Sequence, residues 1–156
     1  MNVVALGPQE WPRWRALRLA ALAEAPEAFG STLAQWSGAG DTEERWRGRW
    51  DGVPHNLVVV QDGRDVGMVS LAAPDGTEPP ELISMWVAPG VRGTGVADAA
   101  VGAVLALAAT AYPGQPVVLS VYEHNGAAIR LYARHGFVDA GPSPDGEGER
   151  RMVRGG

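Results

Sequence analysis

Apolar and polar positions repeat along the chain with two periods, and these periods divide it into strands and helices. Alternation with β-branched and aromatic residues indicates strands, whereas apolar residues spaced by three and four indicate helices. The pattern predicts strands at residues 2–6, 57–61, 66–73, 81–87, 117–121, 137–140 and 150–154. It predicts helices at residues 12–23, from 31, at 41–50, at 96–111 and at 126–134. No repeats appear, so we expect residues 1–156 to form a single α/β domain.

Turn and cap residues set several boundaries between these elements. Asp62-Gly63-Arg64 predicts a tight hairpin between two strands. Residues 41–44, Asp-Thr-Glu-Glu, have the spacing of a capping box, with Asp41 at the helix start. Asn125 and Gly136 predict the N-cap and the C-terminal stop of the helix at 126–134.

The chain is organised around residues 81–109, where a strand runs through a glycine-rich turn into a long alanine-rich helix. The first N–H groups of a helix lack partners within it, and the helix dipole adds positive charge there. Gly93 and Gly95 have no side chain to prevent a close approach of the backbone to a ligand. This junction therefore predicts a phosphate or pyrophosphate site.

Three phosphate-binding motifs can be compared with this turn. A P-loop requires a lysine, but all 13 basic residues of this chain are arginines, so that interpretation fails. The dinucleotide fingerprint requires a small residue where this chain has Asp98, which disfavours a nucleotide-binding oxidoreductase using NAD. The third motif, R-x-x-G-x-[GA], is matched by residues 92–97, RGTGVA. A plain glycine turn between a strand and a helix is the alternative to all three.

A second motif follows about 30 residues downstream. The short apolar strand at 117–121 is followed by YEHNGAAIRLYARHGF, which ends at Phe137. Asn125 and Tyr132 are seven residues apart, which is two helical turns, so they lie on one side of the predicted helix.

The two motifs in this order resemble the signatures of the GCN5-related N-acetyltransferase (GNAT) family. The resemblance implies a mixed α/β (α+β) sheet with helices on both faces, splayed between the fourth and fifth strands. In relatives that wedge holds the pantetheine arm of acetyl-CoA. The resemblance therefore implies that the chain transfers the acetyl group of acetyl-CoA to a primary amine by direct attack in a ternary complex. A homodimer is common in such families.

The resemblance also implies which residues contact the cofactor. Backbone groups of the fourth strand would pair with the pantetheine amides as an added strand does, and the Val87 N–H could polarise the acetyl carbonyl. The implied cofactor residues are Met85, Trp86, Val87, Arg92, Gly93, Thr94, Gly95, Val96, Ala97 and Asn125. The negative charge of Asp98 would repel a pyrophosphate bound at this turn unless the Asp98 side chain points away from the phosphates.

Two residues are catalytic candidates. Tyr132 corresponds to the family tyrosine that protonates the leaving thiolate; alternatively, it is only a packed aromatic residue. Glu81 resembles the base glutamate of histone-acetylating relatives; alternatively, it is a solvated residue at the start of a strand. Period-two alternation places Glu81 on the same side as Ile83, Met85 and Val87.

The acceptor is not identified by the sequence. Relatives build the acceptor pocket from the connection between the first two helices, where Trp36 also lies. The candidates there are Glu24, Glu27, Phe29, Ser31 and Thr32. The alternative is that these residues only form the connecting loop and do not contact the acceptor. A small amine, an antibiotic amine, a protein N-terminus and a lysine all remain open as acceptors, because a fold does not define the second substrate. A non-catalytic acyl-CoA-binding or sensing module is the main alternative function.

Composition excludes several other classes of protein. The net charge of -5 and the pI near 5.1 argue against nucleic-acid binding and suit a cationic amine. No uncharged apolar run of 18 residues and no signal peptide occur, so we expect a cytoplasmic protein without membrane contact. The absence of cysteine excludes an acyl-cysteine intermediate, and the three histidines lack the spacing of a metal site.

Overall fold

The computed structural model describes residues 1–26, 29 and 31–155, and its centre is one mixed sheet. The strands are β1 (Asn2–Leu6), β2 (His55–Gln61), β3 (Arg64–Ala72), β4 (Glu81–Val87), β5 (Val117–Tyr122), β6 (Val138–Pro142) and β7 (Glu149–Arg154). They lie in the order β1-β2-β3-β4-β5-β7-β6, and β4 and β5 form the parallel pair. The predicted mixed α/β sheet is therefore confirmed.

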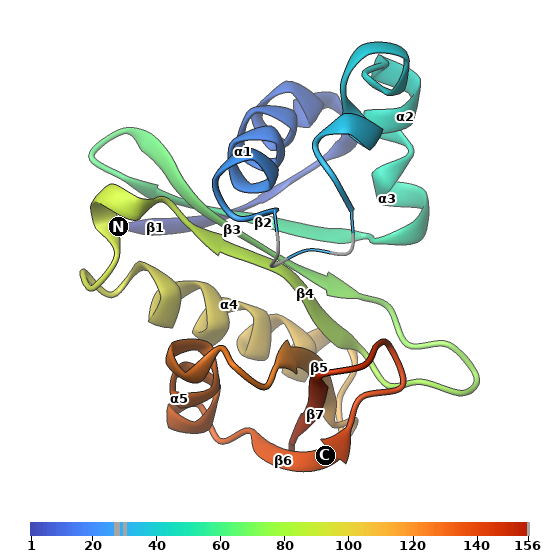
Figure 1. Cartoon of the computed structure of the whole chain (residues 1–156), viewed down its shortest axis with the longest axis vertical. Coiled ribbons are helices and arrows are strands. Elements are labelled where there is room, and N and C mark those ends of the chain that lie inside the picture. The colour runs from blue at the N-terminus through green and yellow to red at the C-terminus, as the bar shows by residue number, and fades with distance from the viewer. Residues whose placement is uncertain (27–28, 30, 156) are drawn as a thin grey trace.

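Helices cover both faces of this sheet (Figure 1). The helices are α1 (Trp11–Glu24), α2 (Glu43–Arg47), α3 (Arg49–Gly52), α4 (Val96–Ala111) and α5 (Gly126–Arg134). One apolar core lies between the sheet and the helices α4 and α5, and a second core, which contains Trp14 and Trp46, lies under α1 and α2. Burial of these two apolar layers holds the helices on opposite faces.

The connection between α1 and β2 differs from its prediction. The helix predicted from Ser31 is replaced by two short 3-10 turns, Ala34–Trp36 and Gly38–Gly40. The predicted capping box is wrong, because Thr42 is the N-cap and its Oγ1 accepts the Arg45 N–H at 3.2 Å. The Asp41 carboxylate instead accepts hydrogen bonds from Arg15 and from the Trp46 indole.

The hairpin between β2 and β3 forms where it was predicted. Its two turn residues, Asp62 and Gly63, have φ values of 52° and 74°. Two successive positive φ values are typical of a type I′ turn, whose twist matches that of the flanking strands. Aspartate followed by glycine is a common pair in this turn.

A β-bulge in β4 overturns the predicted alternation of its side chains. Ser84 has a φ of 57°, and the pairing register with β3 shifts between Met68 and Ser70. Leu82, before the bulge, packs in the core beneath α4, and Met85 after it packs against that same core. Glu81 therefore lies on the opposite face from Met85 and Val87, because one extra residue inverts the order of the faces.

β4 and β5 are joined at one end and separate at the other. Their ladder contains the pair Glu81↔Val118, and the Val118 N–H also donates to the Pro80 carbonyl at 3.1 Å. On the adjacent strand, Arg151 of β7 forms an ion pair with Glu78, in the loop before β4. Beyond this joined end no ladder connects the two strands within the described residues, so the sheet opens into the predicted wedge.

Candidate active site

The wedge between β4 and β5 contains a cavity of about 830 Å³. Both strands, α5, the end of α1 and the loop after β4 supply its walls. The predicted site residues that line it are Glu24, Phe29, Met85, Trp86, Val87, Arg92, Ala97, Asn125 and Tyr132. Residues from segments far apart in the sequence therefore meet at one hollow, large enough for an extended ligand.

The backbone of Val87 faces this opening. Val87 lies opposite Gly67 of β3, and the next residue, Ala88, donates its N–H to the Val66 carbonyl of that same strand at 2.8 Å. Because hydrogen-bonding groups alternate between the two sides of a strand, the Val87 N–H and C=O point away from β3. The Val87 carbonyl accepts Arg92 Nε at 3.0 Å, in agreement with this direction.

The glycine turn leads into α4 as predicted. Gly93 and Gly95 have φ values of 82° and 91°, a left-handed conformation that glycine adopts without strain, and Gly95 is the N-cap of α4. Ala97 lines the cavity, whereas Gly93, Thr94 and Gly95 do not. The Val96 side chain is buried in the core at 1% exposure, so only its backbone could face a ligand.

The Arg92 side chain is held by the end of α1. Its Nη2 donates to Glu24 Oε2 at 2.9 Å, and the same carboxylate oxygen accepts the Trp86 indole N–H at 2.9 Å. The Arg92 guanidinium, and then the indole, lower the pKa of Glu24 below its ordinary value. Glu24 therefore links α1, β4 and the glycine turn at the mouth of the cavity.

The acidic residue at the start of α4 is directed toward α5. Asp98 accepts a hydrogen bond from His135 Nε2 at 2.8 Å and from Arg134 Nη2 at 3.2 Å. The hydrogen bond from His135, and then that from Arg134, lower the pKa of Asp98. The carboxylate thus joins two helices, and Asp98 is absent from the cavity wall.

Asn125 and Tyr132 both face the cavity from α5. Asn125 is the N-cap, and its Oδ1 accepts the Ala128 N–H at 3.2 Å. Tyr132 is 7% exposed, and its ring meets Phe137 edge-on at 5.8 Å between ring centroids. Burial raises the pKa of the Tyr132 phenol well above its ordinary value, so the hydroxyl remains a proton donor at neutral pH.

Glu81 lies at the joined end of the wedge and does not line the cavity. Burial raises the pKa of its carboxyl to about 6, and the nearby charge of Asp145 contributes to the rise. The charge of Glu149, which does line the cavity, acts in the same direction. A carboxyl group with this pKa can exchange a proton near neutral pH.

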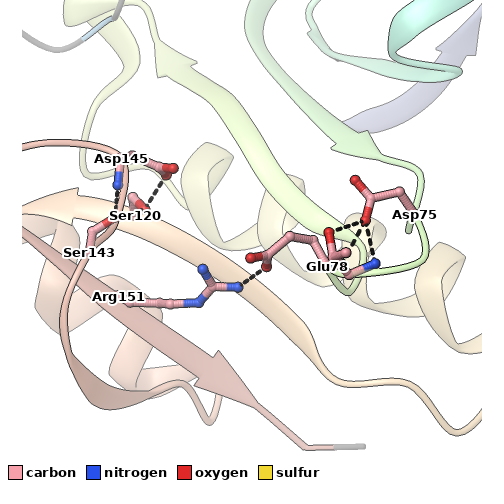
Figure 2. A network of polar contacts seen from close by, with 7 residues as sticks. Asp75, Glu78, Ser120, Ser143, Asp145 and Arg151 are labelled. Atoms are coloured by element: carbon pink, nitrogen blue, oxygen red, sulfur yellow. Dashed lines mark hydrogen bonds and ion pairs between the residues drawn. The ribbon is translucent and has the colours of Figure 1, made fainter.

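Figure 2 shows a network of Ser120, Ser143 and Asp145 that no sequence motif predicts, and the charge of its Asp145 acts on Glu81. Ser120 of β5 lines the cavity and donates to Asp145 Oδ2 at 2.6 Å, and Ser143 lies 2.6 Å from the Ser120 oxygen. Because Ser120 has one proton to donate, Ser143 donates to Ser120. These residues come from a strand and a distant loop, so no sequence spacing predicts their contact.

The predicted acceptor residues have different positions. Glu24 and Phe29 line the cavity, and Ser31 and Thr32 do not. Glu27 lies outside the described residues. Trp36, which the connection also contains, packs on Trp46 with 4.6 Å between ring centroids and is likewise not part of the cavity wall.

Metal-ligand clusters and membrane-spanning helices are both absent from the described part of the chain. Residues 1–26, 29 and 31–155 contain no group of three or more His, Cys, Asp or Glu side chains placed to hold a metal ion. Within those residues, no helix combines the length and apolar character needed to cross a bilayer.

Comparison with known proteins identifies the family to which this chain belongs. The model of the acetyltransferase (GNAT) family matches residues 17–137. No curated protein matches the chain. An acetyltransferase of the GNAT family from Streptococcus pneumoniae is a similar solved structure, with a TM-score of 0.77, 16% identity and 98% of each chain covered.

Two further solved structures have the same fold. The ribosomal-protein-alanine N-acetyltransferase from Brucella melitensis has a TM-score of 0.72 and 21% identity, with 99% of each chain covered. The PaiA N-acetyltransferase from Thermoplasma acidophilum, solved in complex with coenzyme A, has a TM-score of 0.71 and 12% identity over 100% of both chains. The family match covers most of the chain, and the splayed sheet and glycine turn agree with it: this protein belongs to the GNAT acetyltransferase family.

Proposed function

We propose that this protein is an N-acetyltransferase that moves the acetyl group of acetyl-CoA to a primary amine within a ternary complex. The observation that carries the proposal is the wedge, where β4 and β5 part beside α5 and enclose a cavity of about 830 Å³. Backbone groups of β4 would pair with the pantetheine arm there. The first N–H groups of α4, after the turn at Gly93 and Gly95, would bind the pyrophosphate.

The proposed chemistry requires three groups around the thioester carbon. The amine nitrogen attacks that carbon, the C–N bond forms, and the C–S bond breaks with release of the coenzyme A thiolate. The Val87 N–H stabilises the oxyanion, and Tyr132 donates the proton that the thiolate takes. A free alkylamine is neutral in roughly one molecule per thousand near pH 7, so a base is needed. Glu81 accepts the amine proton through Ser120 and water, because Ser120 lines the cavity and Glu81 does not.

The names of the structural relatives refer to more than one kind of acceptor. The protein from Brucella melitensis is a ribosomal-protein-alanine N-acetyltransferase, and another neighbour is a spermidine N-acetyltransferase chimera that derives in part from Vibrio cholerae and has a TM-score of 0.72. At 20 or 21% identity, neither name transfers to this chain. We keep a primary amine as the proposed acceptor class and expect a cytoplasmic enzyme.

The proposal is tested by release of free thiol from acetyl-CoA in the presence of a panel of amines. The chain has no cysteine, so the protein adds no thiol to the background. It also has no lysine, so acetyl-lysine found after the reaction must come from an added substrate. We expect amine-dependent thiol release, and we expect the Tyr132→Phe variant to reduce it.

A non-catalytic acyl-CoA sensor would behave differently. It would bind acetyl-CoA in a calorimetric titration but would release no thiol with any amine, before or after Tyr132→Phe. That combination would refute the proposed transfer reaction while retaining the cofactor site.

A further inference from the structure

Arg18 of α1 is a buried cation for which the described residues supply no hydrogen-bond partner. Its side chain belongs to a residue that is 6% exposed, and its Nε and Nη1 atoms contact no acceptor in residues 1–26, 29 and 31–155. Its guanidinium carbon lies 4.9 Å from the ring centroid of Phe29, a residue of the cavity wall. Burial lowers the pKa of Arg18 to about 10.

Arg49 of α3 is a second cation in the same region, and it is partly buried. Its Nε donates to Asn56 Oδ1 at 3.1 Å, and its Nη2 donates to Ser70 Oγ at 3.0 Å and to Ser84 Oγ at 2.9 Å. All three acceptors are uncharged, and Ser84 lines the cavity. Burial, and then the charge of Arg18, lower the pKa of Arg49 to about 10.

The paired arginines of the chain provide a contrast. Among residues 1–26, 29 and 31–155, seven arginines form ion pairs with carboxylates: Arg13, Arg15, Arg47, Arg92, Arg134, Arg150 and Arg151. Those side chains are all more exposed than Arg18. The buried Arg18 thus lacks a carboxylate partner among the described residues, and its positive charge acts on the guanidinium of Arg49. A buried charge without a counterion is costly, and a guanidinium matches a planar carboxylate with two parallel hydrogen bonds.

We propose that Arg18 and Arg49 bind a carboxylate of the acceptor, so that the acceptor is a small molecule carrying both an amine and a carboxylate. The proposal rests on the proposed acetyl transfer and adds the class of its second substrate. Phe29 and Ser84 connect the two arginines to the cavity wall. Glu81 lies at the joined end of the wedge, and the charges of Asp145 and Glu149 both act on it, so these three carboxyl groups form an acidic group. This arrangement suits an amine at the acidic end and a carboxylate at the arginine end.

The test compares amino acids with amines that lack the carboxylate. One series pairs L-leucine with isoamylamine and L-phenylalanine with 2-phenylethylamine. A second series pairs glycine, β-alanine, 4-aminobutyrate and 6-aminohexanoate with n-alkylamines of matching length. We expect kcat/KM for thiol release from acetyl-CoA to be at least about ten-fold higher for the best amino acid than for its matched amine, as expected for a charge-assisted hydrogen bond.

Substitution separates carboxylate binding from a structural role. Arg18→Met keeps the apolar stem and removes the charge, so we expect the best amino acid to lose about ten-fold or more in kcat/KM while its matched amine is little changed. Arg49→Lys, which retains a charge but not the planar fork, should reduce the same preference. Arg47→Met is the control, because Arg47 is exposed and pairs with Glu43 at 2.9 Å, and it should leave the preference intact.

The outcomes distinguish a failure of carboxylate recognition by the arginines from a failure of the proposed acetyl transfer. Carboxylate recognition would be refuted if amino acids and their matched amines had equal kcat/KM. It would also be refuted if Arg18→Met lowered kcat/KM equally for both, and in either case the proposed acetyl transfer would stand. If thiol is released from acetyl-CoA with none of the acceptors, the proposed acetyl transfer is refuted. Calorimetric titration of the same amino acids into the protein with coenzyme A bound then tests whether their carboxylate binds at the arginines. Binding that Arg18→Met abolishes would support the arginine site, and no binding of any amino acid would refute it.

Discussion

Tyr132 combines a buried hydroxyl with a position on the cavity wall. Phe137 supports its ring edge-on, so removal of the hydroxyl alone leaves the packing in place. We predict that Tyr132→Phe lowers kcat roughly 100-fold, because general acid catalysis typically contributes 100-fold or more. Steady-state kinetics would measure kcat, and calorimetry would show an unchanged Kd for acetyl-CoA. A variant that retains full kcat would exclude Tyr132 as the proton donor.

Glu81 provides a pH dependence with a definite sign. Because burial raises the pKa of its carboxyl to about 6, the base form is lost as the pH falls through 6. We predict that kcat/KM rises with pH up to about pH 6 to 7 and then levels, and that Glu81→Gln removes this limb and costs about 100-fold at pH 8. A rate profile from pH 5 to 9 would measure both. If the fall in kcat/KM at low pH were unchanged in Glu81→Gln, that fall would belong to the titration of another group.

The stability of Glu81→Gln gives an independent check. A carboxyl whose pKa is raised in the folded state disfavours its own charged form there, so it destabilises the protein as pH rises from about 4.5 through 6. We therefore expect the glutamine variant to unfold at the same or a higher temperature at pH 8. A large decrease would show that the carboxylate is needed for the fold, and the kinetic loss would then have a structural cause.

Site residues differ in how far the sequence could predict them. The resemblance to the GNAT signature marked Asn125 and Tyr132 as site residues, and their spacing of seven placed them on one side of the helix. Arg18 and Asp145 were not predicted, because their importance depends on what surrounds them in space. Arg18 lies four residues after Trp14 and four before Leu22, so the helical period places it on the buried face of α1, unlike the partly buried Arg13 and Arg15. The sequence does not show that its guanidinium lacks a partner there.

At the scale of elements, α4 approaches β3 at a glycine. A Cβ atom built on Gly67 would lie 3.0 Å from Val96 Cγ1 and 3.3 Å from the Trp86 carbonyl oxygen. Both neighbours are fixed, since Val96 begins α4 at 1% exposure and Trp86 belongs to β4. The absence of a side chain at Gly67 therefore sets how closely the phosphate-binding end of α4 can lie against the sheet.

We predict that Gly67→Ala destabilises the protein by about 1–3 kcal/mol, as overpacking of a core does. It should also raise the Kd for acetyl-CoA, because the displaced methyl groups lie at the start of α4. Chemical denaturation and calorimetry would measure the two effects. Gly102→Ala, within α4 and with open space around the added methyl group, serves as the control and should not weaken either property. Equal behaviour of the two variants would contradict the close-packing explanation.

The elements themselves were largely predictable, and the exceptions have physical causes. Strands, the two long helices and the Asp62-Gly63 turn follow from local periodicity and turn chemistry. The bulge at Ser84 could not be predicted, because serine has no special preference for a positive φ and the distortion arises from pairing with β3. That single residue inverts the faces of β4 and moves Glu81 away from the side of Met85.

At the scale of the whole molecule, the sheet consists of two parts joined at one end. β1 to β4 form an antiparallel set, β5 to β7 form another, and the shared ladder pair is Glu81↔Val118. The Glu78–Arg151 ion pair reinforces this end, and α4 packs across β2, β3 and β4. A cofactor in the wedge would contact both parts, so binding should stabilise the molecule as a unit.

Hydrogen exchange at two adjacent amides tests where the cofactor binds. The Val87 N–H faces the wedge, whereas the Ala88 N–H already donates to Val66 at 2.8 Å. We predict that acetyl-CoA slows exchange at Val87 by more than about ten-fold and changes Ala88 much less, because only Val87 gains a hydrogen-bond partner, worth about 1 kcal/mol or more. NMR-detected exchange would measure both amides, and NAD should protect neither. Thermal stabilisation by acetyl-CoA without protection of Val87 would place the cofactor outside the wedge. The oxyanion role of that N–H would then be lost even if the enzyme remained an acetyltransferase.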